Sequence, residues 1–540
     1  MQGARTRGSV NYSLCGIPFS FIFPSILILC YYLGDLPEFS HNYRAMVNTQ
    51  ILIVGAGPTG LTLACELARR NVSFRIIDRV SEYQTGSRAK GVQPRSLEVF
   101  DDLGVAQELA EASFTELVYR RFNGNQLLGD VKRETFPRED TQYIQGFVVP
   151  QWKVEVVLRE KLAEYGVKVE LATELVEFSQ NDESVTAVLK NSSETEEVNC
   201  EYLVACDGGK SNIRKALGIK FEGETHEEEK LLVGDVEVKG LTPDAWHVWV
   251  HPEFGFSIAL CPFRCTKSWQ LQAIAFPDEN GDIPEPDLEI FNRIFQERAR
   301  MPEVKLKNMT WHSIYRVNVR MADKYRVGRV FIAGDAAHVH STAGGLGMNT
   351  GIQDAYNLGW KLAAVVKDNA PPSLLDTYEE ERLPIAGWTL NISSQRQSML
   401  AESAKHGGSG LENIATKDTT QLNLNYRYSS LSVDLSGEYD SLQAGDRAPD
   451  AKLSDGSWLF DLYRGTHFTV LAFDDTEESV KNIDKTFGEG VKAYRLTDPN
   501  ARSVFGNRSK IFVIRPDGYI GLVTKSGETE KVIEYLRRFR

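Results

Sequence analysis

The feature that most constrains this chain is a short apolar run that ends in a glycine-rich turn. Ile51–Val54 is continuously apolar, as expected of a strand buried on both faces of a sheet. The turn that follows reads GAGPTG over residues 55–60, and after it come the helical pattern LTLACELARR and a second strand-like run ending at Asp78. Strand, turn, helix and strand within about 30 residues predict a βαβ unit.

The spacing of the three glycines is typical of turns that bind the diphosphate of a dinucleotide. Gly55 would allow the tight turn, Gly57 would let the diphosphate approach the backbone, and Gly60 would let helix and strand pack closely. The start of the helix would stabilise the phosphate charge, and Asp78 is placed to bind the adenosine ribose. A chance cluster of glycines is the alternative, but the surrounding strand and helix argue against it.

Two further predicted strands also end in aspartate or glycine. Residues 202–206 read YLVAC and lead into Asp207 and Gly208, and residues 330–333 read VFIA and lead towards Asp335. A glycine-rich stretch, AGGLGMNTG, then precedes a predicted long helix. Because the carboxyl ends of parallel strands meet at one edge of a sheet, these segments should converge where open α/β sheets bind ligands. Taken singly, the two aspartates could instead be turn or N-cap residues.

The chain is predicted to combine α/β and α+β domains. A Rossmann-like domain would be formed by residues 46–227 and 310–402. Between them, residues 228–309 read as alternating or aromatic-rich strands, which predicts an inserted antiparallel sheet that would bind a substrate. Residues 403–440 are polar and weakly periodic, as in a linker, and residues 441–540 show a compact β-α-β-β-α pattern.

Composition excludes several classes of protein. With 61 Lys and Arg against 74 Asp and Glu, the net charge of −13 argues against a nucleic-acid-binding surface. The seven cysteines form no CxxC pair, so neither a disulfide scaffold nor a metal site is predicted. The apolar share of 42% is enough for cores of ordinary size.

The beginning of the chain is unusually apolar. Residues 17–33 read IPFSFIFPSILILCYYL, which has the character of a signal sequence or membrane anchor. A spanning helix needs about 20 apolar residues, however, and two prolines interrupt this run. Met46 stands only a few residues before the first predicted strand. We therefore expect residues 1–45 to be dispensable or a gene-model extension and the protein to be cytoplasmic, whereas a retained helix over 17–33 would anchor it to a membrane.

Three motifs in this order resemble those of the FAD-dependent aromatic hydroxylases. These are single-component flavoprotein monooxygenases of the para-hydroxybenzoate hydroxylase type, and the resemblance is closest to the phenol and polyketide hydroxylases. The motifs are GAGPTG with Asp78, CDGGKSNIR from residue 206, and GDAAHVHSTAGGLGMNTGIQDAYNLGWKL from residue 334. The stretches SRAKGVQPRSLEVFDDLG and VVPQWKVEVVLREKL support them. The resemblance implies a bound FAD, a thioredoxin-like C-terminal domain without redox cysteines, and a homodimer.

The resemblance also assigns cofactor contacts to individual residues. Asp78 would bind the adenosine ribose, Arg88 the diphosphate side and Gln151 the ribityl region. Asp335 would bind the ribityl or pyrophosphate region. The backbone that would meet the edge of the isoalloxazine ring is that of Gly347, Met348 and Asn349. The motif with Asp207 and Gly208 is expected to serve both FAD and a transiently bound NADPH or NADH, since no second GxGxxG lies between a strand and a helix.

The implied reaction is an oxygen transfer. NADPH or NADH would reduce FAD, O₂ would add to the ring at C4a, and the resulting hydroperoxide would pass one oxygen to an electron-rich carbon. A phenol reacts better as phenolate, and its pKa is about 10, so a base or a cation would help. The candidates are His340, Tyr315 and Arg316, with His251 and His338 beside them. His338 fits a structural role better, and the sequence does not choose among the others.

Alternative functions remain open at this point. Epoxidation of an activated alkene uses the same oxygen donor as hydroxylation of an aromatic ring. A flavin-dependent halogenase would show WxWxIP, which AWHVWVHP over residues 245–252 does not match. A flavin reductase, another non-oxygenase flavoprotein or a membrane-anchored FAD-binding protein is the remaining class. The sequence thus predicts a flavin enzyme that acts on an aromatic or alkene-bearing small molecule.

Overall fold

The computed structural model describes residues 47–540, apart from residues 133, 134, 136, 193, 252–254, 276–282, 284, 342–344, 406–416, 438–441, 507 and 508. The predicted extension 1–45, with its apolar stretch 17–33, lies outside the described residues. Within the described ranges, no helix combines the length and the apolar character needed to cross a membrane.

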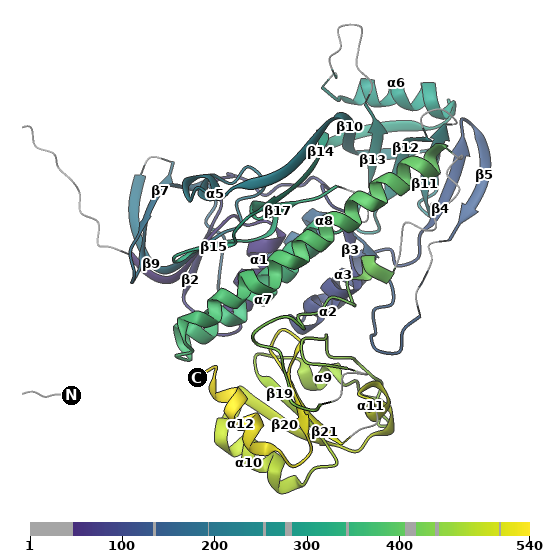
Figure 1. Ribbon diagram of the computed structural model, residues 1–540. Coiled ribbons are helices and arrows are strands. Elements are labelled where there is room, and N and C mark those ends of the chain that lie inside the picture. Colours follow the sequence, from purple (N-terminus) through teal and green to yellow (C-terminus); the bar gives the residue numbers. More distant parts are fainter. Residues whose placement is uncertain are drawn as a thin grey trace, which may run out of the picture. The chain divides into compact units, whose positions relative to one another are not determined.

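The first sheet, whose strands β2, β7, β9 and β15 are labelled in Figure 1, is built around the predicted strand β1. β1 pairs in parallel with β2 on one side and with β9 on the other, and β16 continues the parallel set beyond β9. Ile51, Leu52 and Ile53 are fully buried, which explains why this run is apolar throughout. β8 and β7 extend β9, and β15 pairs with β16, in antiparallel fashion. The strands are β1 (Val47–Val54), β2 (Phe74–Ile77), β7 (Thr173–Gln180), β8 (Val185–Asn191), β9 (Glu194–Ala205), β15 (Arg326–Val327) and β16 (Val330–Ile332).

Helices pack around this sheet and share its core. Pro58 occupies the first turn of α1, where a missing N–H costs nothing and the fixed φ favours a helix start. The later part of the glycine-rich stretch, from Gly347 on, does not precede the long helix α7 but forms its first turn. The helices are α1 (Pro58–Ala68), α2 (Pro94–Asp102), α3 (Ala106–Ala112), α4 (Gln151–Glu164), α5 (Asn212–Ala216), α7 (Gly347–Lys367) and α8 (Asp376–Lys405), with short 3-10 turns η1 (Gly334–Ala336) and η2 (Pro372–Leu375). A small ribbon pairs β3 (Gly91–Val92) with β6 (Phe147–Val148).

The second sheet has the strand order β17-β14-β10-β13-β12-β11-β4-β5. Neighbouring strands are antiparallel except for β4 and β11, which pair in parallel. The sheet extends beyond the predicted insertion 228–309, because β10 begins earlier, β14 ends later, and β4, β5 and β17 join it. The strands are β4 (Val118–Asn123), β5 (Gln126–Val131), β10 (Phe221–Lys239), β11 (Ala245–His251), β12 (Gly255–Pro262), β13 (Ser268–Ile274), β14 (Lys305–Ala322) and β17 (His338–Val339).

The two faces of the second sheet have different coverings (Figure 1). Helix α6 (Leu288–Ala299) packs on the outer face, where Phe291 and Phe295, one helical turn apart, are fully buried against Trp249 and other strand residues. The opposite face, which we call the inner face, holds the alternate residues of each strand. It contacts α8 and the chain between β2 and β3.

The C-terminal domain contains a third sheet with the order β18-β22-β21-β19-β20. Its first strand, β18 (Val433–Asp434), belongs to the predicted linker 403–440, so part of that segment is ordered structure. The other strands are β19 (Phe468–Phe473), β20 (Val491–Leu496), β21 (Lys510–Ile514) and β22 (Ile520–Lys525), and the helices are α9 (Phe460–Tyr463), α10 (Glu477–Phe487), α11 (Pro499–Val504) and α12 (Thr529–Arg537). The likeness of this domain to thioredoxin stays a prediction.

Candidate functional site

The turn between β1 and α1 is closed on one side and open on the other. Gly55 has a φ of +106°, and a Cβ added at Gly60 would lie 2.0 Å from the carbonyl oxygen of Gly55. Side chains are therefore excluded at both positions. A Cβ at Gly57, by contrast, would meet nothing within 4 Å, and Gly57 is the N-cap of α1. An anion can approach the backbone there and meet the unpaired N–H groups of the first helical turn.

Asp78, at the end of β2, supports this turn. Its Oδ2 accepts a hydrogen bond from the backbone N–H of Ala56 at 2.8 Å, and its Oδ1 accepts one from Val80 at 3.1 Å. Each carboxylate oxygen keeps a further acceptor position. The side chain can therefore hold the turn and still bind a ribose hydroxyl.

The second motif leaves a carboxylate oxygen available. Asp207 Oδ2 accepts from the backbone N–H of Asn212 at 3.0 Å. Its Oδ1 is buried and has no hydrogen-bond partner among the described residues, and burial raises the pKa of this carboxyl group. An orphaned buried acceptor of this kind indicates a missing donor, such as a ligand hydroxyl.

Arg214 joins the second motif to the third. Its guanidinium donates to the carbonyl oxygen of Ala336 at 2.8 Å and to that of Gly209 at 3.0 Å. Asp335, beside Ala336, is solvent-accessible, yet protein surrounds it closely enough that desolvation raises the pKa of its carboxyl group. Electrostatic interactions with His338 and Arg88 oppose this effect. The side chain of Asp335 is thus accessible to solvent, although it lies in a crowded part of the protein.

A buried aspartate that the sequence did not single out holds the third motif in place. Asp354 of α7 binds His338 Nε2 at 2.6 Å, Arg382 Nε at 2.8 Å and the backbone N–H of Gly334 at 3.1 Å. Although burial opposes ionisation, these neighbours lower the pKa of Asp354 to about 2. The motif GIQDAYNLGWKL contained this residue, but only its partners, which are remote in sequence, reveal its role.

The chain from Arg88 to Gln93 connects the remaining predicted cofactor residues. Asn349, in the first turn of α7, accepts from the backbone N–H of Gln93 at 2.8 Å and donates to the carbonyl oxygen of Gly91 at 3.0 Å. Gln151 starts α4, and its backbone N–H donates to the carbonyl oxygen of Ala89 at 2.9 Å.

Arg88 itself is exposed, and its charge acts on Asp335 and on Glu155, whose carboxylate accepts from the Gln151 amide at 2.9 Å. Gly347 and Met348 are half-buried beside Asn349. These contacts bring the predicted cofactor residues together at one edge of the first sheet. Their individual contacts with a cofactor stay predictions.

The predicted catalytic candidates are not all near one another. Tyr315 on the inner face donates its hydroxyl to the carbonyl oxygen of His340 at 3.0 Å, whereas Arg316, the next residue along β14, is exposed. His340 is 7% exposed, and its ring lies 4.8 Å from that of His338. Burial lowers its pKa well below the usual value, and neither ring nitrogen has a partner within the described structure. His340 is therefore a neutral imidazole and a weak proton acceptor. The side chain of His251 lies outside the described part of the chain.

Sequence reasoning missed a polar cluster on the inner face. Ser87 and Lys90 meet Asp235 of β10 and Gln270 of β13 there, and Trp246 of β11 lies beside them. The available signal was a charged residue at an inward position of an apolar strand, as in LLVGDVEV.

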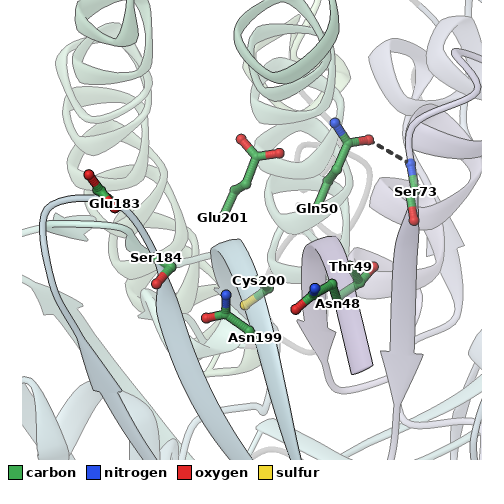
Figure 2. A pocket seen from close by; sticks show the side chains of 9 residues that line it. All are labelled: Asn48, Thr49, Gln50, Ser73, Glu183, Ser184, Asn199, Cys200 and Glu201. Atoms are coloured by element: carbon green, nitrogen blue, oxygen red, sulfur yellow. Dashed lines mark hydrogen bonds between the residues drawn. The ribbon is translucent and has the colours of Figure 1, made fainter. Parts of the chain in front are cut away.

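Figure 2 shows a surface pocket of about 440 Å³ at the opposite end of the first sheet. It is lined by the start of β1, including Gln50, which accepts from the backbone N–H of Ser73 at 3.0 Å. The carboxylates of Glu183 and Glu201 also line it, and they would repel phosphate groups. The pocket is thus a poor place for a dinucleotide.

The glycine-turn edge, in contrast, fits FAD on its own geometry. It offers an open helix start at Gly57, an orphaned carboxylate oxygen on Asp207 and a solvent-accessible carboxylate on Asp335. These are the groups that a diphosphate and a polyhydroxylated chain require.

Comparisons with known proteins agree with this geometry. Residues 48–392 match the family model described as FAD binding domain. The chain is 39% identical, over 90% of its length and 99% of the relative's, to a flavin-dependent monooxygenase of Mycobacteroides abscessus. It is 34% identical to the pentachlorophenol 4-monooxygenase of Sphingobium chlorophenolicum, over 81% of this chain and 82% of that one.

A solved structure is also similar. Aklavinone-11 hydroxylase in complex with FAD and aklavinone matches with a TM-score of 0.77 and 27% identity, over 91% of this chain and 98% of that chain. From the glycine turn, the convergence of the three motifs and these matches, it follows that the chain belongs to the FAD-binding domain family and is an FAD-dependent monooxygenase.

Proposed function

We propose that this enzyme hydroxylates a phenolic or polyketide-like aromatic small molecule, using NADPH or NADH and O₂. The observation that carries the proposal is the position of the chain from Ser87 to Gln93. It is bonded to the first turn of α7 through Asn349 and to the inner face of the second sheet through Ser87 and Lys90. A substrate on that face would lie next to the edge where FAD fits. The proposal includes a cytoplasmic location, where NADPH and NADH are available to the enzyme.

Bound FAD would supply the redox chemistry, taking two electrons from the nicotinamide and passing one atom of O₂ to the substrate. The residues of this chain would bind FAD, orient the substrate and shield the reaction from water. The helix start at Gly57 would hold the diphosphate, and Asp335 would hold the polyhydroxylated chain. Val248, Val250 and Ala259 form an apolar cluster on the inner face that would exclude water from the reaction.

The names of the similar proteins favour an aromatic substrate. One relative is named for pentachlorophenol, and the similar solved structure contains aklavinone. Hydrogen-bond donors on the inner face, among them Lys90 and Trp246, fit the same class of substrate.

The decisive experiment measures NADPH, NADH and O₂ consumption by the purified full-length protein with a panel of phenols and aromatic polyketides. We expect a yellow protein whose nicotinamide oxidation rises several-fold with at least one phenol, and a product heavier by one oxygen atom. A folded protein that takes up no FAD, or one that no aromatic compound stimulates, would contradict the proposal.

The Asp335→Ala variant tests the cofactor edge directly. Because Asp335 is the accessible carboxylate at that edge, we expect the variant to fold and to lose most of its FAD, as measured by absorbance after gel filtration. Asp368→Ala, on an exposed residue after α7, is the matched control and should keep its FAD. Equal FAD content in both variants would refute the role of Asp335.

A further inference from the structure

The backbone around Lys90 is held by main-chain contacts on both sides. The carbonyl oxygen of Lys90 accepts from the N–H of Val149 at 3.3 Å, and the neighbouring carbonyls of Ala89 and Gly91 accept from Gln151 and Asn349. None of these bonds involves the Lys90 side chain. That side chain extends to the inner face of the second sheet.

The Lys90 ammonium has few partners on that face. It lies 4.5 Å from the centre of the Trp246 ring and donates to Gln270 Oε1. An ammonium has three N–H groups, and among the described residues no ion pair joins it to a carboxylate. The group is therefore a partly buried cation with donors to spare.

The nearest acid does not act as its direct counter-ion. Both oxygens of Asp235 are engaged by Ser87, one through the backbone N–H at 2.8 Å and one through the hydroxyl. The titratable groups whose charge acts on Lys90 are Asp235 from β10 and Cys261 from β12, while β11 and β13 present the non-titratable Trp246 and Gln270. Burial outweighs them and lowers the pKa of Lys90 to about 8, so the amine is still mainly protonated at neutral pH.

Other donors on the same face also lack acceptors. Trp246 Nε1 and Arg121 Nε are buried without a hydrogen-bond partner anywhere in the described structure. Arg121 shares its face of β4 with Tyr119, whose ring lies 5.3 Å from that of Trp246. The inner face thus offers hydrogen-bond donors and positive charge to a ligand, with the buried apolar residues Val248, Val250 and Ala259 beside them.

From this arrangement we infer that Lys90 binds the ionised oxygen of a phenolic substrate, with the Trp246 and Arg121 donors selecting oxygen-rich aromatic compounds. The inference rests on the proposed function and names the charge that the reaction needs. On binding, the phenol O–H bond breaks, the proton passes to water and the electron pair stays on the oxygen, which enriches the ring carbons that accept oxygen. An opposite charge within about 4–6 Å lowers the pKa of an acid by about 1–3 units.

The test titrates 4-nitrophenol bound to the FAD-loaded enzyme, because its phenolate absorbs visible light and its neutral form does not. We expect the wild type to lower the apparent pKa of the bound probe by about 1–3 pH units. Lys90→Arg should keep this shift and Lys90→Met should abolish it, while 4-nitroanisole, which cannot ionise, should bind both proteins equally. Lys267→Met, on the exposed turn between β12 and β13, is the matched control and should behave as the wild type.

The pH dependence gives a second readout. Above about pH 8 the Lys90 ammonium loses its proton, so the affinity of the wild type for the phenolate should fall there, and that of Lys90→Met should not change. A wild type that neither binds the probe nor shifts its titration overturns the inference. So does a Lys90→Met protein that is less stable but titrates the probe normally, since Lys90 would then merely balance the charge of Asp235.

The titration is independent of turnover. Phenol-stimulated nicotinamide oxidation with no effect of Lys90→Met on the titration would leave the proposed function standing and remove Lys90 from it. If the titration shift is normal but no phenol stimulates nicotinamide oxidation, Lys90 would keep its role in binding the phenolate and the proposed hydroxylation would be refuted.

Discussion

Two regions of this enzyme contain buried charge and treat it in opposite ways. Between α7, α8 and the C-terminal domain, Glu381 accepts from Lys361 at 2.7 Å and from Arg515 at 2.6 and 3.0 Å, and all three side chains are fully buried. Asp517 completes this group through Arg515 and the indole N–H of Trp360. On the inner face of the second sheet, Lys90 and Arg121 lack carboxylate partners among the described residues.

The paired charges around Glu381 connect α7 and α8 to the C-terminal domain, whereas the unpaired cations of the inner face can bind a ligand. A balanced buried network strongly disfavours the loss of any member, because the others are left unpaired in a medium of low polarity. Removing a cation that has unused donors costs the unliganded protein little stability. The same cation contributes binding energy when an anionic ligand is present. The following predictions test whether the two regions really divide in this way.

The largest expected effect is that of Glu381→Gln. Removing this charge leaves Lys361 without its buried counter-ion and Arg515 with Asp517 alone, and we expect the free energy of unfolding to fall by about 3–5 kcal/mol. Chemical denaturation at neutral pH measures it. Glu380→Gln, at the preceding residue, is the control. The Glu380 carboxylate accepts from the backbone N–H and the hydroxyl of Ser430, and the variant should lower the free energy of unfolding by less than about 1 kcal/mol. Equal losses of unfolding free energy in the two variants would show that the buried network does not stabilise the protein more than a surface contact does.

A smaller effect, with a defined pH dependence, is expected for Asp354→Asn. The pKa of Asp354 falls from its usual 3.8 to about 2 on folding. The ionised carboxylate therefore adds about 2 kcal/mol of stability above roughly pH 4, which is lost as the pH falls towards 2. The difference in unfolding free energy between wild type and variant should shrink over that range. A difference independent of pH would contradict the assignment, and Asp368→Asn should show no difference at any pH.

The smallest effect on stability is expected for Arg121→Met. Because its charge has no ion-pair partner within the described residues, the free energy of unfolding should change by less than about 1 kcal/mol. Binding of 4-nitrophenol should weaken several-fold, as measured by absorbance titration.

Arg120→Met provides the matched control for this comparison, since Arg120 is paired with Asp130 at 2.9 Å and Asp244 at 3.0 Å. It should leave probe binding unchanged. If Arg121→Met destabilised the enzyme as much as Glu381→Gln, the inner face would be structural and the division would fail.

The cofactor edge could be predicted from the sequence because each of its parts is local. Gly55, Gly57 and Gly60 lie within one turn, and the strand before them and the helix after them are legible from hydrophobic pattern alone. The predicted flavin monooxygenase identity and the mixed fold were confirmed by the comparisons.

The inner face could not be predicted because its residues meet only through sheet register. Lys90, Trp246 and Gln270 are far apart in the chain, and a shift of one residue in β13 would turn Gln270 to the other face. The parallel pairing of β4 with β11, which brings Arg121 to this face, leaves no trace in the pattern of either strand. Nor does the pattern of α8 show that Glu381 meets Arg515 from a separate domain.

The way in which the backbone at residue 90 is secured has an evolutionary consequence. Since main-chain atoms of its neighbours are bonded to α4 and α7, exchange of the side chain at this position need not disturb the place where FAD fits. Such a position allows a lineage to explore new substrates by single substitutions while its cofactor chemistry is conserved. Replacement of Lys90 by an acid would then favour cationic or hydrogen-bond-donating substrates, and by an apolar residue neutral ones.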